Sequence, residues 1–309
     1  MGITKGSWNI IKPMEVARSH APVIAYKGMI YVFGGGGPEF SSLDSCVRYN
    51  PTTEEWSDLT PMPTKRSGTA AFLINGKVYV VGGGFKKPDG NFQFLKTVEI
   101  YDPETDSWET GPDMNQPHDY PAATLVGETI YILGGHHPEA CLGGPKTDPG
   151  FDYCERWAPG QASWEEIAPL PTPRFAAAAL TRNDTIYTSG GVAFRPEGFN
   201  NFDFFENFSL SAGSWSKDEN LKLPWPAAGQ GMCSVNNDFF FFGGYSTDNI
   251  HTRAAVCPEK ETEWQRIPDM PMPRAAMGVV VIDSTIYLIG GWEDDGRTPM
   301  NSVVAYSWN

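Results

Sequence analysis

Long apolar runs are missing from this sequence. No segment approaches the roughly 20 consecutive apolar residues of a membrane-spanning helix. Near the first residue there is also no basic region followed by an apolar core, which is the pattern of a secretory signal. These absences predict a cytoplasmic protein that has no membrane as a partner.

Basic residues are also scarce. The chain has 23 Lys and Arg against 37 Asp and Glu, which gives a formal net charge of −14. Nucleic acids and anionic membranes bind basic surfaces, so neither is an expected partner. No P-loop or dinucleotide fingerprint is present, because the glycine-rich stretches end apolar runs and no helical pattern follows them. We therefore expect no cofactor.

Cysteine is used only five times, an odd number, and never in a CxxC motif. This pattern predicts neither a metal site nor a disulfide framework. Buried free thiols in a reducing compartment are the favoured interpretation. A bridge between Cys141 and Cys154, across one long loop, remains an alternative.

Glycine, by contrast, is abundant, and six glycine pairs each follow a short apolar run. The pairs recur every 47 to 56 residues and begin at Gly34, Gly82, Gly134, Gly190, Gly243 and Gly290. Tryptophan follows the same period at Trp8, Trp56, Trp108, Trp164, Trp215 and Trp264. A third position, here called the marker residue, precedes each pair by sixteen residues: Arg18, Arg66, His118, Arg174, Ala227 and Arg274. Three markers in one register indicate six structural repeats.

One repeat, residues 67–111, shows what each unit builds. An apolar run (67–74) is followed by the hairpin dipeptide Asn75-Gly76 and a β-branched and aromatic run (77–81). After a long excursion, residues 97–111 contain two more strands around a turn. The pattern predicts four strands and no helix. Six such sheets suit radial closure, which leaves only short strand edges exposed.

The glycine pairs, the Tyr and turn before each Trp ("EIYDPETDSW", "VRYNPTTEEW") and the spaced Trp residues resemble Kelch repeats. This resemblance covers nearly the whole chain, and the fourth and fifth repeats depart most from the pattern. It implies an all-β, six-bladed β-propeller with four antiparallel strands per blade. We expect one domain, residues 1–309, in which blade six combines residues 274–309 with 1–14, so that the N-terminal strand closes the ring.

In such a propeller the loop that enters each inner strand and the loop after each glycine pair share one rim. We therefore expect a ligand site at the mouth of the central channel. Its predicted residues are Arg18, Arg66, Arg174, Arg274, His118, Phe85, His136, Tyr245 and Trp292. A ring of Arg side chains is suited to gripping carboxylates. An open alternative is that these Arg residues pair with acidic or backbone groups of the rim itself.

The function that follows is a monomeric protein-binding module. Its expected partner is an acidic peptide of another protein or a small carboxylate ligand, since Kelch adaptors use Arg at matching positions. The alternative is an enzyme of the sugar-acid isomerase or mutarotase type, because some bacterial Kelch propellers of similar length have this activity. In that case the candidate catalytic residues are His118, His136, His137 and Glu139. Ordinary hydrogen-bonded loop histidines are the simpler interpretation, and no metal site is predicted.

Overall fold

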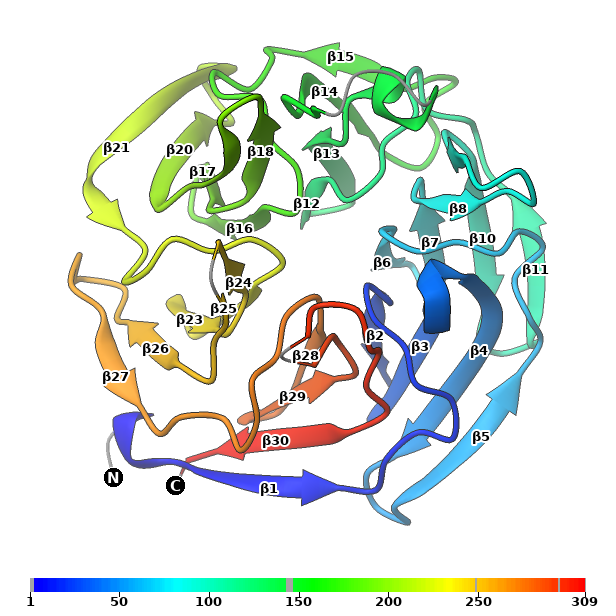
Figure 1. Ribbon diagram of the computed structural model, residues 1–309. Helices are drawn as coiled ribbons and strands as arrows, with labels where there is room; N and C mark the ends of the chain where they lie inside the picture. Colours follow the sequence, from blue (N-terminus) through cyan, green and yellow to red (C-terminus); the bar gives the residue numbers. More distant parts are fainter. Residues whose placement is uncertain (1–2, 143–146, 248, 294, 309) are drawn as a thin grey trace.

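The computed structural model describes residues 3–142, 147–247, 249–293 and 295–308 of the chain. Six four-stranded antiparallel sheets are arranged around a central axis like the blades of a propeller (Figure 1). This confirms the all-β, six-bladed architecture. The only helices among the described residues are the short 3₁₀ turns η1 (Ile3–Lys5), η2 (Pro38–Phe40) and η3 (Pro138–Leu142). No described helix has the length and apolar character needed to cross a membrane.

The first three blades follow the chain in order, and each runs from an inner to an outer strand. Blade one contains β2 (Val23–Tyr26), β3 (Met29–Gly36), β4 (Ser42–Asn50) and β5 (Glu55–Leu59). Blade two contains β6 (Ala70–Ile74), β7 (Lys77–Val81), β10 (Val98–Asp102) and β11 (Ser107–Thr110). Blade three contains β12 (Ala122–Val126), β13 (Thr129–Gly135), β14 (Phe151–Trp157) and β15 (Glu165–Ile167).

The last three blades repeat this order, with one exception at the ends of the chain. Blade four contains β16 (Ala178–Arg182), β17 (Thr185–Ser189), β20 (Phe204–Ser209) and β21 (Ser214–Lys222). Blade five contains β22 (Gly231–Val235), β23 (Asp238–Phe242), β26 (Ala254–Cys257) and β27 (Gln265–Ile267). Blade six contains β28 (Gly278–Ile282), β29 (Thr285–Ile289), β30 (Val303–Ser307) and β1 (Ser7–Ile11).

The ring is therefore closed by the N-terminal strand, as the sequence predicts. Strand β1 pairs with β30 in an antiparallel register from Ser7 opposite Ser307 to Ile11 opposite Val303. Figure 1 shows β1 along the outer edge of blade six, with the two ends of the chain close together. This pairing joins residues about 300 positions apart, so it holds the first and last blades together.

The glycine pairs are explained by close backbone approach. Gly34 and Gly35 have φ values of +52° and +100°, which favour residues without a side chain. A Cβ on Gly34 would lie 2.7 Å from the carbonyl oxygen of Arg66, and one on Gly35 would lie 2.7 Å from that of Ser19. Each pair thus lies at the end of the second strand of its blade, where the entering loops of its own and the next blade cross that strand.

The tryptophan repeat joins neighbouring blades. The indole N–H of Trp108 donates a 2.9 Å hydrogen bond to the carbonyl of Thr60 in the preceding blade, and Trp56 bonds to Lys12 at the same distance. Both rings also pack against core clusters that span two blades. The Trp residues therefore stabilise the interfaces between blades.

Three small hairpins rise from one end of the propeller. They are β8 (Gly84–Lys86) with β9 (Phe92–Phe94), β18 (Val192–Arg195) with β19 (Gly198–Asn201), and β24 (Tyr245–Ser246) with β25 (Asn249–Ile250). Together with the loops of the other blades they form the rim of the molecule.

All described cysteine side chains are free and buried; they are Cys46, Cys154, Cys233 and Cys257. The side chain of Cys141 lies outside the described residues.

Candidate functional site

A closed ring of backbone hydrogen bonds encircles the central axis. One residue from each blade donates its N–H to the carbonyl of the residue before it in the ring, at 2.6 to 3.3 Å, and the sixth bond returns to the first residue. The members, here called the hydrogen-bonded ring, are His20, Gly68, Tyr120, Ala176, Gly229 and Ala276. All six have positive φ values between 51° and 64°. Each member lies two residues after a marker residue, so the repeat positions the ring.

Only two members of this ring carry large side chains, His20 and Tyr120. Their rings meet edge to face with centroids 4.4 Å apart, and His20 also contacts Trp292 at 4.3 Å. Burial, and then the nearby His136, lower the pKa of His20 to about 3. On one side lies the central cavity, with a volume of about 890 Å³. A smaller space of about 290 Å³, lined by the inner strands, lies on the other. The ring therefore forms the floor of the central cavity.

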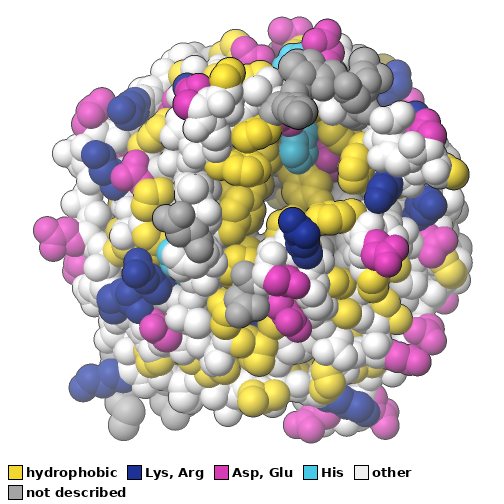
Figure 2. Space-filling model, in the orientation of Figure 1, with side chains coloured by type: hydrophobic (Ala, Val, Ile, Leu, Met, Phe, Trp, Pro, Cys, Tyr) yellow, Lys and Arg dark blue, Asp and Glu magenta, His cyan; other side chains and the backbone are white. Residues whose placement is uncertain are grey.

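The walls of the central cavity are mainly aromatic. They are formed by rim loops and small hairpins of several blades, and their aromatic members include Phe94, Tyr120, Phe175, Phe194, Tyr245 and Trp292. Figure 2 shows the apolar side chains gathered around a central hollow. Three further phenylalanines line the cavity and are partly exposed to solvent: Phe40 at 46 %, Phe92 at 39 % and Phe199 at 53 %. The mouth of the cavity is thus an exposed apolar surface.

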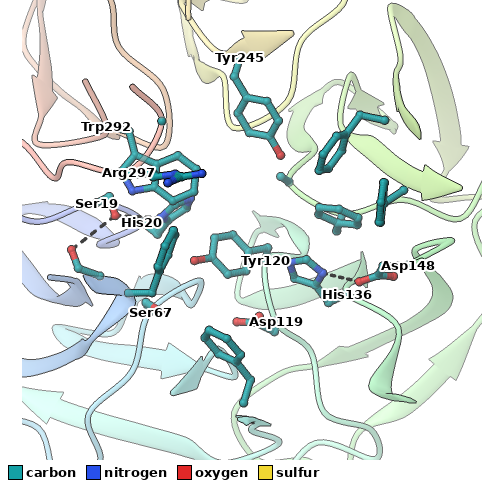
Figure 3. A pocket seen from close by; sticks show the side chains of 18 of the residues that line it. Ser19, His20, Ser67, Asp119, Tyr120, His136, Asp148, Tyr245, Trp292 and Arg297 are labelled. Atoms are coloured by element: carbon teal, nitrogen blue, oxygen red, sulfur yellow. Dashed lines mark hydrogen bonds and ion pairs between the residues drawn. The ribbon is translucent and has the colours of Figure 1, made fainter. Parts of the chain in front are cut away.

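A histidine–aspartate pair occupies one wall. Nδ1 of His136 lies 2.5 Å from Oδ2 of Asp148, and the imidazole stacks on Phe175 with centroids 4.0 Å apart (Figure 3). The other carboxylate oxygen of Asp148 accepts backbone N–H bonds from His137 and Gly150. Burial opposes ionisation, but these hydrogen bonds hold the pKa of Asp148 below its ordinary value. Both polar groups are therefore already engaged with each other.

Asp119 is different, because one oxygen of its buried carboxyl group has no partner among the described residues. The residue is only 4 % exposed, it lines the cavity next to Tyr120, and its Oδ1 atom makes no hydrogen bond to any described residue. Burial, and then the charge of Asp148, raise the pKa of Asp119 well above its ordinary value. A Cβ on Gly68 would lie 2.6 Å from this oxygen, so a glycine in the floor makes room for it.

The structure corrects the expected placement of the marker arginines. Arg18, Arg66, Arg174 and Arg274 are at most 1 % exposed and are absent from the described lining of the cavity. Each donates through Nη1 to the carbonyl of the first glycine of its own blade, for example from Arg66 to Gly82 at 3.0 Å. In four blades the residue after the marker lines the cavity, whereas the marker itself points back into the blade; these residues are Ser19, Ser67, Asp119 and Phe175. The guanidinium groups therefore tie the entering loop to the second and third strands.

Two blades make this bond with another side chain. In blade three, His118 is fully buried, with Nδ1 2.6 Å from the carbonyl oxygen of Gly134 and Nε2 3.1 Å from Glu155. In blade five the indole N–H of Trp225, two residues before the marker position, donates a 3.0 Å bond to Gly243. His118 therefore has the structural position of an arginine and does not line the cavity.

Side chains alternate between two directions along an extended segment, and this alternation decides which of the other predicted site residues line the cavity. His136, Tyr245 and Trp292 follow a glycine pair directly and line the central cavity. Phe85 is one residue further along and contacts Lys65 instead, with the ammonium group 5.8 Å from the ring centroid.

His137 is likewise one residue too far, and its ring meets Phe151 at 5.8 Å. Glu139 is exposed on η3. Neither belongs to the described cavity lining. The four candidate catalytic residues therefore do not converge, and no metal-binding group of His, Cys, Asp or Glu occurs among the described residues.

The residues predicted for the mouth leave out two that line the cavity, Asp119 and Tyr120, although the sequence places Asp119 beside the candidate residues His118 and His136 as a possible member of an acid–base cluster. The signal for both is the fixed spacing of the repeat. The residue after each marker bonds to the residue after the glycine pair, seventeen positions later, as Asp119 does to His136 and Ser19 does to Gly36. The position after the marker, in place of the marker itself, gives a cavity-lining residue in four of the six blades.

Comparisons with known proteins agree with this fold. A family model described as the KLHDC2/KLHL20/DRC7 Kelch-repeats domain matches residues 3–191, and a Kelch motif model matches residues 273–307. Human Kelch-like protein 23 is 29 % identical over 220 residues, which cover 70 % of this chain and 36 % of that protein. Kelch-like protein 15 of Danio rerio is 26 % identical over 226 residues, covering 66 % and 35 %.

The match thus spans about a third of the length of these curated relatives. A solved structure entitled "Structure of YjhT" superposes with a TM-score of 0.79 at 16 % identity, covering 95 % of both chains. This likeness concerns the fold alone. Because a Kelch family model covers more than half of the chain, this protein belongs to the Kelch-repeat family of β-propellers.

Proposed function

We propose that this propeller is a protein-interaction module that receives a segment of a partner protein in its central cavity. The observation that carries the proposal is the mouth of that cavity, where Phe40, Phe92 and Phe199 are exposed around an aromatic-lined hollow. Clustered exposed aromatic side chains are typical of interaction sites and provide rigid contact area. Full burial of one such side chain contributes about 1.5–3 kcal/mol, so three of them favour association substantially.

The volume of the cavity fits a short segment. About 890 Å³ lies within the roughly 300–1,000 Å³ of ordinary ligand sites, so the cavity accommodates a few side chains of a peptide and not a folded domain. The exposed phenylalanines come from η2, β9 and β19, which belong to three different blades. A peptide that enters the cavity would therefore contact several blades at once.

The charge of the cavity argues against the acidic ligand expected from the sequence. Arg297 is the one Lys or Arg in the described lining, against Asp119, Asp148 and Asp295. The marker arginines are already bonded to backbone carbonyls. An acidic peptide or a small carboxylate would therefore depend on Arg297, which is exposed at the mouth. The sugar-acid isomerase alternative loses support for the same reason.

We retain the cytoplasmic location as a proposal, since the described thiols are free and buried.

The test is selection of a phage-displayed random-peptide library on the immobilised protein. The wild type should enrich a consensus containing a bulky apolar residue, and the variant Phe40→Ser/Phe199→Ser should lose that enrichment. The matched control is Ile10→Ser, which removes a 76 % exposed apolar side chain from the outer strand β1. Enrichment that persists in the rim variant, or no consensus at all, would contradict the proposed site. Parallel thermal-shift measurements with sugar acids test the enzyme alternative.

A further inference from the structure

We propose that the bound segment carries a Lys or Arg side chain whose cationic group is received by the Asp119 carboxyl, among the aromatic rings at the floor of the central cavity. This inference rests on the proposed function, because it uses the same cavity. The charge of this side chain is opposite to that of the acidic ligand predicted from the arginine pattern. The argument starts from the surroundings of Asp119 and then compares the ligands that those surroundings admit.

Backbone hydrogen bonds fix the position of Asp119, but no described residue pairs with the Oδ1 atom of its carboxyl group. Its backbone carbonyl accepts a 2.7 Å hydrogen bond from the N–H of His136, and the next residue, Tyr120, belongs to the hydrogen-bonded ring. The side chain is 4 % exposed, and no ion pair joins it to a described Lys, Arg or His. Buried polar groups are nearly always paired, so an unpaired carboxyl that faces a cavity indicates a binding partner supplied from outside.

The other charged groups around the cavity do not supply that partner. His136 is bonded to Asp148, and Arg297 is exposed at the mouth. The remaining imidazole, His20, is kept neutral by burial, which lowers its pKa to about 3. A ligand with a carboxylate would add a third acidic group beside Asp119 and Asp148. Burial and the charge of Asp148 already raise the pKa of the Asp119 carboxyl, and both would oppose an ionised ligand carboxylate in the same way, so the cavity disfavours such a ligand.

The aromatic walls favour a cation for an independent reason. Figure 3 shows Tyr120, Tyr245 and Trp292 around the same open space, into which the Asp119 carboxyl faces. The faces of Tyr and Trp rings attract ammonium and guanidinium groups, more strongly where water is excluded. The aliphatic part of a Lys or Arg side chain would pack along the same rings. A net charge of −14 on the chain also draws basic segments toward the molecule.

The direct test uses minimal probes, so it does not depend on finding the natural partner. Nα-acetyl-arginine amide, Nα-acetyl-norleucine amide and Nα-acetyl-glutamate amide are titrated against ¹⁵N-labelled protein. The readout is the indole N–H resonance of Trp292, identified with the variant Trp292→Phe. We expect saturable shifts with the arginine probe on the wild type. In Asp119→Asn the affinity for this probe should fall by about tenfold or more, because a charge-assisted hydrogen bond is lost. The control Asp58→Asn removes an equal charge from the exposed outer strand β5 and should bind as the wild type does.

Equal binding of the norleucine or glutamate probe, or unchanged arginine binding in Asp119→Asn, would overturn the inference. Should Asp119→Asn fail to fold, the comparison of the three probes on the wild type decides the question by itself. The two proposals fail separately. A peptide consensus that needs the rim phenylalanines but has no basic position would contradict the inference of a bound Lys or Arg side chain and leave the protein-interaction function standing. Arginine binding at Asp119 without any peptide consensus would contradict the protein-interaction function and leave the cation site standing.

Discussion

Replacement of Arg66 by Met should strongly destabilise the propeller. The guanidinium group is fully buried and bonds to the carbonyls of Gly82 and Thr97 at 3.0 and 3.2 Å, and it forms a 2.7 Å ion pair with buried Glu99. Removal of one partner of a buried ion pair destabilises a protein by about 3–5 kcal/mol. Each buried carbonyl that loses its donor adds about 1–3 kcal/mol, although such terms are not additive. We therefore expect a loss of at least about 3 kcal/mol.

The assay is chemical unfolding followed by circular dichroism, with the midpoint and slope compared between variants. Arg297→Met is the matched control, because it removes an exposed arginine at the mouth, and it should change stability by less than about 0.5 kcal/mol. Arg66→Lys should lie between the two, because an ammonium group is a point charge that cannot bridge two carbonyls and a carboxylate together. A loss below about 1 kcal/mol in Arg66→Met, together with weakened peptide binding, would refute the structural role and restore the arginine-lined mouth.

Two further predictions concern single groups in the entering loops of blades five and three. Trp225→Phe keeps an aromatic ring in place but removes the hydrogen-bond donor to Gly243. Thermal unfolding should therefore show that the free energy of unfolding falls by roughly 1–3 kcal/mol. Trp225→Met is less suitable, because it would also remove the aromatic packing. Asp119 has a folded-state pKa raised above its unfolded value by burial and by Asp148, so its protonated form stabilises the fold at low pH, and this contribution is lost as pH rises through the raised pKa. The melting temperature of Asp119→Asn should therefore decline less than that of the wild type between about pH 4 and pH 8; identical pH profiles would show that this carboxyl titrates normally.

The architecture was predictable because it depends on periodic features. The glycine pairs recur at positions where two loops cross a strand, and a side chain would clash there, so the same solution is repeated in every blade. Trp108 and its equivalents repeat because each one bonds to the preceding blade. The closing strand was predictable because the final repeat lacks a fourth strand, and residues 7–11 supply it. These features are properties of spacing, which a sequence records directly.

The candidate site was predictable only in part, because spacing does not give the direction of a side chain. Arg174 and Phe175 are adjacent in the same entering loop, yet the first points into the blade and the second into the cavity. The replacement of an arginine by Trp225 was also hidden, since the indole reaches the glycine carbonyl from two residues earlier. The importance of Asp119 depends on a carboxyl oxygen that no described residue pairs with, and only the three-dimensional structure shows this.

The account is tested most directly by a crystal structure of the propeller with its library-selected peptide. We expect a basic side chain of the peptide within hydrogen-bonding distance of Asp119 and peptide apolar groups against Phe40 and Phe199. The guanidinium groups of the marker arginines should remain on the glycine carbonyls. A peptide bound on another face of the propeller, or an acidic peptide side chain paired with Arg66 or Arg274, would contradict the account.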